Sequence, residues 1–254
     1  MYSFSYGTAE GEFYGAQRNE KGEIEIMRSD YKTGGKILFY SLKDDLTAGE
    51  QVGEAGLYDP RTRPWYKAAE EAGKPVFSPV FKHFFIEDLA VSAACPVYNE
   101  DGRLKGVIGT HLLLSGIGEY LQEAVSKYNG LAIIIENGSG TLVANSMGVK
   151  NFSYLENGQI KRLKLDELGN SDIQKAYEHY KANGRAIQLY RGEKDNYYVS
   201  VGKIRLEGID WTILSAVPES IFVGDVKRSI GLTIFIAALA SVISVTAFHI
   251  IMRI

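Results

Sequence analysis

L-Y-D-P-R-T-R-P-W-Y, residues 57–66, gathers two prolines, two arginines, one tryptophan and two tyrosines in one short stretch. Each proline fixes its own φ and pushes the residue before it toward an extended conformation, so the stretch predicts a turn. Pro64 suits the first position of a helix, which the sequence predicts to end at Gly73. The core-facing stripe of that helix consists of Trp65, Ala68, Ala69 and Ala72. Tyr66 lies about 100° round the helix from Trp65 and is expected to point to a rim or pocket.

This stretch resembles the helix-opening motif of the double Cache domains, which are extracytoplasmic sensor modules of bacterial chemoreceptors, histidine kinases and nucleotide cyclases. Those modules consist of two PAS-like subdomains flanked by membrane helices. The order of elements resembles the family over nearly the whole soluble part. The specific motifs are residues 57–66 and G-V-I-G-T-H-L at residues 106–112.

The resemblance also implies a binding site. In the amino-acid-sensing members, the Arg, Trp and Tyr of the helix motif hold the ligand's carboxylate and amine, and a strand Tyr and a last-strand Asp complete the amine site. The matching positions here, with Asp59 added from the same turn, are Asp59, Arg63, Trp65, Tyr66, Phe81 and His111. Phe81 replaces the strand Tyr and His111 replaces the Asp. An ammonium group in a partly buried site needs a carboxylate or several acceptors. The sequence therefore favours an anionic ligand, such as a small organic acid, over an α-amino acid.

Plainer interpretations of these residues stay open. Arg63 could form a structural ion pair with Asp59, and Trp65 could be a core residue. His111 could be a buried histidine with satisfied hydrogen bonds; if it lines a pocket, its titration near neutral pH would make binding pH-dependent. Further aromatic residues that could complete the walls are Tyr31, Phe39, Phe77, Phe84 and Phe85.

The composition narrows the function. With 254 residues, a net charge of −3 and no basic stripe, the chain is not expected to bind nucleic acid. The lone Cys95 excludes an intrachain disulfide and a multi-cysteine metal site. Gly116 and Gly118 lack the third glycine of a dinucleotide loop, and the four histidines lack metal-ligand spacing. We therefore expect a sensory or binding region without a cofactor rather than an enzyme.

The predicted fold class is α+β, with two tandem PAS-like antiparallel-sheet subdomains followed by one transmembrane helix. Residues 1–118 form the membrane-distal, ligand-binding subdomain, 119–222 the membrane-proximal subdomain and 223–254 the transmembrane helix. In the second subdomain, residues 131–145 predict a hairpin, and Ser171-x-x-Gln174 predicts a capping box that opens a helix.

Residues 229–251 contain no Asp, Glu, Lys or Arg. As a helix they would span roughly 34 Å, enough for a bilayer core of about 30 Å. Lys227 and Arg228 on one side against Arg253 on the other slightly favour a cytoplasmic soluble part. The resemblance instead implies an extracytoplasmic part anchored in the inner membrane. Small residues such as Ala237 and Ser241 lie at helix-packing spacing, compatible with a homodimer.

The chain begins inside a predicted strand and has few residues after the predicted span. We therefore expect a fragment of a receptor that lacks its first membrane helix. The leading alternative is a C-terminally anchored interaction or scaffold domain that faces the cytoplasm and whose pocket has degenerated. A second alternative is the same sensor within a longer cyclase or kinase.

Overall fold

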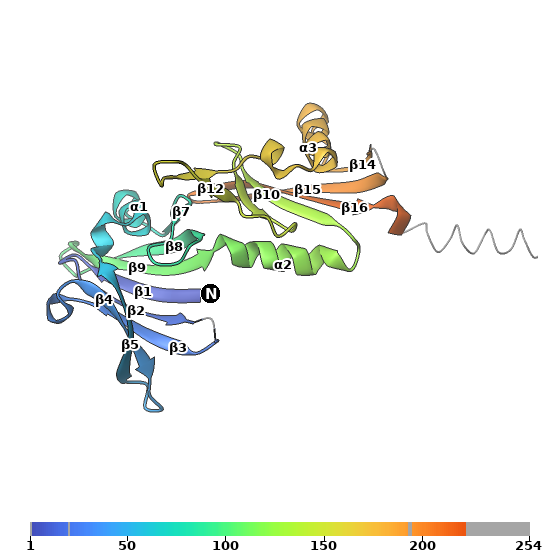
Figure 1. Cartoon of the computed structure of the whole chain (residues 1–254). Helices are drawn as coiled ribbons and strands as arrows, with labels where there is room; N and C mark the ends of the chain where they lie inside the picture. Colours follow the sequence, from blue (N-terminus) through green and yellow to red (C-terminus); the bar gives the residue numbers. More distant parts are fainter. Residues whose placement is uncertain (1, 20, 193–194, 222–254) are drawn as a thin grey trace, which may run out of the picture.

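The structure is a computed structural model that describes residues 2–19, 21–192 and 195–221 (Figure 1). Its first part is a nine-stranded antiparallel sheet of order β5-β4-β3-β2-β1-β9-β8-β6, with β7 paired to β8. These strands are β1 (Tyr2–Thr8), β2 (Phe13–Arg18), β3 (Ile24–Ser29), β4 (Lys36–Leu42), β5 (Ala48–Leu57), β6 (Val76–Phe77), β7 (Phe81–Lys82), β8 (Leu89–Tyr98) and β9 (Leu104–Leu113). Two short 3-10 helices, η1 (Tyr31–Thr33) and η2 (Pro60–Thr62), and helix α1 (Pro64–Ala72) complete this part.

Helix α1 follows the prediction made from residues 57–66. It begins at Pro64 and ends at Gly73, whose φ of 62° is left-handed and whose N–H donates to Ala69 O. The helix packs on β8 and β9 and buries Trp65 and Ala69 against the sheet. Tyr66 is equally buried, because the start of the helix is covered from the β1 side as well. Of the two expectations for Tyr66, a rim or a pocket, the rim is therefore wrong.

The second part starts with helix α2 (Leu114–Ser126), which leads from the first sheet to the second (Figure 1). The second sheet is five-stranded and antiparallel, of order β11-β10-β16-β15-β14. Its elements are β10 (Leu131–Glu136), β11 (Leu142–Asn145), β14 (Ile187–Arg191), β15 (Asn196–Leu206) and β16 (Ile209–Pro218). Between β11 and β14 lie β12 (Phe152–Tyr154), β13 (Ile160–Arg162), η3 (Leu165–Leu168) and α3 (Ser171–Asn183).

The local predictions for this part hold with one correction. Strands β10 and β11 form the predicted antiparallel hairpin. Helix α3 begins at Ser171, but its cap residue is Asn170, whose side chain accepts from Ile173 N at 3.1 Å. The predicted capping box of Ser171 and Gln174 is therefore wrong: Asn170 caps the helix one residue earlier, and Ile173 at the third helical position has no side-chain acceptor to complete a box.

The antiparallel, sheet-rich α+β class is confirmed. The predicted boundary at 118/119 falls inside α2, and the division into subdomains stays a prediction. Among the described residues, no helix is long and apolar enough to cross a membrane. The predicted span at 223–254, and the small residues that suggested a homodimer, lie outside the described residues.

The two sheets share a hydrophobic cluster that joins Leu89, Val91 and Leu114 to Ile134, Ile209 and Trp211. The turn between β15 and β16 also reaches the first sheet. Phe77 N donates to Glu207 O at 2.8 Å, and Lys74 Nζ lies 3.0 Å from Glu207 Oε2. The turn at residues 206–209 and strand β6 together form what we call the inter-sheet contact.

Gly208 is required at this contact. Its φ is +85°, and a Cβ built on it would lie 2.0 Å from Phe77 O. Because Phe77 O is a backbone atom, this clash can be relieved only if the backbone shifts. We expect Gly208→Ala to lower the free energy of unfolding by about 1–3 kcal/mol. Urea unfolding measures this. Gly202→Ala is the matched control, because a Cβ at Gly202 on β15 meets nothing within 4 Å. Equal stability of the two variants would contradict the contact.

Candidate functional site

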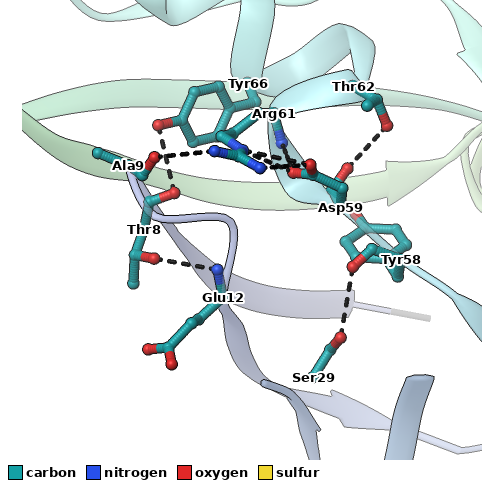
Figure 2. Close-up of polar contacts among 9 residues, drawn as sticks. All are labelled: Thr8, Ala9, Glu12, Ser29, Tyr58, Asp59, Arg61, Thr62 and Tyr66. Carbon is teal, nitrogen blue, oxygen red and sulfur yellow. Dashed lines mark hydrogen bonds and ion pairs between the residues drawn. The ribbon is translucent and has the colours of Figure 1, made fainter. Parts of the chain in front are cut away.

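The turn before α1 is held by an ion pair between Asp59 and Arg61 (Figure 2). Asp59 Oδ1 accepts from Arg61 N at 3.0 Å, and Arg61 Nη2 lies 2.7 Å from Asp59 Oδ2. Arg61 Nη1 also donates to Ala9 O at 3.3 Å, which ties the turn to the loop after β1. The hydrogen bonds from Arg61 hold the pKa of the Asp59 carboxyl below its usual range. Asp59 is thus engaged by Arg61, and the alternative of an Asp59–Arg63 pair is wrong.

Arg63, half-buried, is left without an ion pair to any carboxylate among the described residues. Its guanidinium carbon instead lies 5.5 Å from the centre of the Tyr58 ring and 5.0 Å from that of Phe84. Cation–π contacts with two rings orient the side chain without neutralising its charge. Arg63 therefore offers a fixed, unneutralised positive group.

Arg63 lines a small cavity of about 20 Å³ between α1, the loop after β7 and the sheet. Four of the six predicted ligand residues line it, namely Arg63, Trp65, Phe81 and His111. The other lining residues are Ser3, Phe13, Met27, Ile37, Tyr58, His83, Phe84 and Phe85. None of the lining residues is an Asp or a Glu. The volume is close to that of one or two water molecules, so a larger ligand enters only if the walls move.

Trp65 is both a core residue and a wall of the cavity. Its side chain is 1% exposed, its Nε1 donates to the Tyr58 hydroxyl at 3.3 Å, and its ring meets that of His111 edge-on at 5.2 Å. Gly109 on β9 makes room for it, because a Cβ there would lie 2.9 Å from Trp65 Cε3. The position of the Trp65 ring thus depends on Gly109, the second glycine of the G-V-I-G-T-H-L motif.

Tyr66 lies on the other side of the helix start. Its hydroxyl donates to Thr8 O at 3.4 Å (Figure 2), and its ring packs beside Pro60 and Gly7. Burial raises the pKa of Tyr66 to about 12. The structure does not bring Tyr66 or Asp59 to the cavity with the other four predicted residues.

His111 is buried between two serines. Its Nε2 lies 2.7 Å from Ser5 Oγ and its Nδ1 lies 2.6 Å from Ser92 Oγ. Burial, then the repulsion from His83 once it is protonated and from Arg63, lowers the pKa of His111 to about 3. The expectation of titration near neutral pH is therefore wrong, and His111 is a neutral imidazole with both nitrogens already bonded.

Three polar lining residues were not singled out from the sequence, namely Ser3, Tyr58 and His83. His83 is 9% exposed and meets the Phe85 ring edge-on at 4.7 Å. Of the predicted wall aromatics, Phe84 and Phe85 line the cavity. Phe39 lies behind the wall and packs edge-on against Phe85 at 5.1 Å, whereas Phe77 belongs to another hydrophobic cluster and Tyr31 is exposed. The sequence does contain one signal for His83, because it lies within the aromatic run F-K-H-F-F at residues 81–85.

A family model described as Cache domain (dCache_1) matches residues 11–226. This chain belongs to the Cache domain family. The methyl-accepting chemotaxis protein McpC of Bacillus subtilis is 27% identical over 117 residues, which make up 46% of this chain and 17% of McpC. The chain thus spans about a sixth of the length of the curated relative that it matches.

Solved structures of ligand-binding domains are similar to this Cache domain. The amino acid chemoreceptor PctB of Pseudomonas aeruginosa PAO1, in complex with L-Arg, has 18% identity and a TM-score of 0.44, covering 86% of this chain and 71% of that one. The chemoreceptor CtaA of Pseudomonas fluorescens, in complex with L-leucine, has 17% identity and a TM-score of 0.46, covering 87% and 72%. PctC of Pseudomonas aeruginosa PAO1, in complex with GABA, has 17% identity and a TM-score of 0.45, covering 85% and 72%.

The lining of this Cache domain's cavity is suited to binding a small molecule. The lining combines hydrogen-bond donors such as Arg63 and Tyr58 with aromatic walls, and no Asp or Glu lines it. In the described part of the chain, no group of three or more His, Cys, Asp or Glu residues could hold a metal ion. The cavity suits a small ligand with a hydrogen-bond-accepting group.

Asp59 offers a test that separates the turn from the cavity. Asp59→Ala removes both the ion pair with Arg61 and the acceptor for Arg61 N, and we expect it to lower the free energy of unfolding by about 1–2 kcal/mol. Asp59→Asn keeps that acceptor, and since both side chains are more than a third exposed we expect it to change stability by only about 0.5 kcal/mol. Neither variant should change ligand affinity more than about threefold. A tenfold loss in Asp59→Asn would show that Asp59 contacts the ligand.

Proposed function

We propose that this chain is the extracytoplasmic sensing region of a membrane receptor, and that it binds a small organic acid in the cavity beside Arg63. The observation that carries the proposal is the unneutralised Arg63 guanidinium on a cavity with no lining carboxylate. A guanidinium fork matches a carboxylate in shape and charge. The aromatic walls would exclude water and add apolar contact with the rest of the ligand.

The same lining disfavours an α-amino acid. Its ammonium group would lie near Arg63 and would find only hydroxyl groups, imidazoles and aromatic faces among the lining side chains. A charged ammonium needs better acceptors than these once it leaves water. Phe81 and His111, where the amino-acid sensors have a Tyr and an Asp, therefore support an acid without an amine.

The relay would pass through the inter-sheet contact. Phe81 on the cavity and Phe77 at the contact belong to two short strands, β7 and β6, that both pair with β8. Because the cavity is only about 20 Å³, ligand entry must displace walls such as Phe81. From the contact, β16 runs through the second sheet to Pro218. A shift of the wall would thus reach β16, which leads to the predicted membrane helix.

The small volume also favours one alternative, an anchored interaction domain whose pocket has degenerated. Topology and binding separate the two. Protease added to spheroplasts, in which the outer membrane is opened, should cleave the folded part of a sensor, whereas strict protection supports the cytoplasmic alternative.

A thermal-shift screen of the purified 254-residue chain tests binding across ligand classes. The screen should include small organic acids, their amides, amines, and the ligands bound in the similar structures, L-Arg, L-leucine and GABA. A true site gives saturable stabilisation, about 2.7 kcal/mol at a ligand concentration 100 times Kd. We expect acids to stabilise and amides and amines not to. The proposal would be contradicted if only amines stabilised the chain, or if no compound did.

A further inference from the structure

His83 differs from His111 in the use of its ring nitrogens. The backbone N–H of Ile86 donates to His83 Nδ1 at 3.2 Å, and His83 N donates to Asp88 O at 2.9 Å. A nitrogen that accepts a hydrogen bond carries no proton, so the neutral imidazole holds its proton on Nε2. The hydrogen bonds of the described residues include no acceptor for that Nε2–H. His111, in contrast, has a serine hydroxyl on each nitrogen.

The His83 ring is also held in place. It meets the Phe85 ring edge-on at 4.7 Å, and the bonds to Ile86 and Asp88 close the loop that follows β7. The loop thus presents a donor on a side chain whose orientation is fixed before a ligand arrives, which lowers the entropy lost on binding.

We propose that His83, as a neutral donor through Nε2–H, binds the ligand's carboxylate together with Arg63 and makes the site specific for short-chain monocarboxylates. This inference rests on the proposed function. One carboxylate oxygen would face the guanidinium and the other would face the imidazole. Both side chains line the same cavity, and no lining carboxylate competes for them. Beyond these two donors, the walls are mainly aromatic and aliphatic, so a second carboxylate would lack a charged partner.

The donor is uncharged over the physiological range. Burial, then the positive charges of Lys82 and Arg63, lowers the pKa of His83 to about 4, and Asp88 opposes this shift only in part. His111, the other imidazole of the cavity, is neutral as well. Binding through a neutral donor needs no protonation step. The affinity for a carboxylate should therefore change less than about threefold between pH 6 and pH 8.

Isothermal titration of the 254-residue chain with sodium propionate, and with propionamide as its uncharged isostere, tests the inference. We expect propionate to bind at least about tenfold more tightly than propionamide. His83→Leu should weaken propionate binding by about tenfold or more, because a hydrogen bond to a charged group is lost. His83→Gln keeps an N–H donor and an acceptor for Ile86 N, and it should stay within about threefold of the wild type. Thermal unfolding of each variant verifies that it is folded.

The outcomes separate the two proposals. If His83→Leu binds propionate like the wild type while Arg63→Gln does not, the role of His83 is overturned and the proposed function stands. If affinity falls tenfold per pH unit above pH 6, a protonated histidine is the donor and the neutral-donor inference is overturned. If propionate and other small acids do not bind the wild type at all, both proposals fail.

Discussion

Trp65→Ala is expected to lower the free energy of unfolding by about 3–5 kcal/mol. The side chain is 1% exposed and packs against Tyr58, Tyr66 and His111. Its removal therefore leaves a large void in the hydrophobic core between α1 and the nine-stranded sheet. Gly109 cannot fill the space, since it has no side chain. Urea unfolding followed by circular dichroism measures the loss.

The control for Trp65 uses the close approach of Gly109. Gly109→Ala places a methyl 2.9 Å from Trp65 Cε3 and should destabilise the wild-type background by about 1–3 kcal/mol. In the Trp65→Ala background, the same methyl enters the void and should be neutral or stabilising. The two substitutions are therefore expected to be strongly non-additive. Additive effects would show that Trp65 does not occupy the space above Gly109.

Acidification from pH 7 to pH 4 is expected to destabilise the fold by several kcal/mol. In the folded chain, the pKa values of His83 and His111 are about 4 and about 3, below the ordinary 6.5. The unfolded chain therefore binds more protons between pH 6.5 and these values, and stability falls as pH falls. One pKa unit corresponds to about 1.4 kcal/mol, which gives up to about 3 kcal/mol for each histidine. The contribution of the two neutral histidines to stability is fully present above pH 6.5.

The urea midpoint measured at intervals from pH 7 to pH 4 tests this. The double variant His83→Gln, His111→Gln carries no imidazole in the cavity, so its profile should be flatter over this range even if its stability at pH 7 is lower. A wild-type midpoint that stays constant down to pH 4, or a double variant with the wild-type slope, would contradict the buried neutral histidines.

The sequence predicted the turn and helix of residues 57–66 because their causes are local. Proline geometry acts on adjacent residues, and Gly73 ends the helix through its own left-handed φ of 62°. The strand patterns likewise gave an antiparallel α+β fold. The position of the α3 cap was missed by one residue, since Asn170 and Ser171 are both good cap residues and only the backbone geometry selects between them.

The site was less predictable because its partners come from distant parts of the chain. Asp59 could pair with either arginine of the motif, and the 3-10 turn η2 brings Arg61 rather than Arg63 to it. The two serines that bond His111 are Ser5 on β1 and Ser92 on β8. Sheet pairing, rather than sequence spacing, places them there, because β1 and β8 both pair with β9. The role of His83 depends on a single backbone N–H in a loop. The aromatic run at residues 81–85 marks His83 as a candidate wall residue, but it does not show which ring nitrogen is left free to donate.

The most direct test of the central claim compares two arginines of the same motif. Isothermal titration with sodium propionate should give an affinity for Arg61→Gln within about threefold of the wild type, because Arg61 holds Asp59 and does not line the cavity. Arg63→Gln should weaken binding by about tenfold or more, since it removes the charged fork that faces the carboxylate. Undiminished propionate binding by Arg63→Gln would contradict the account.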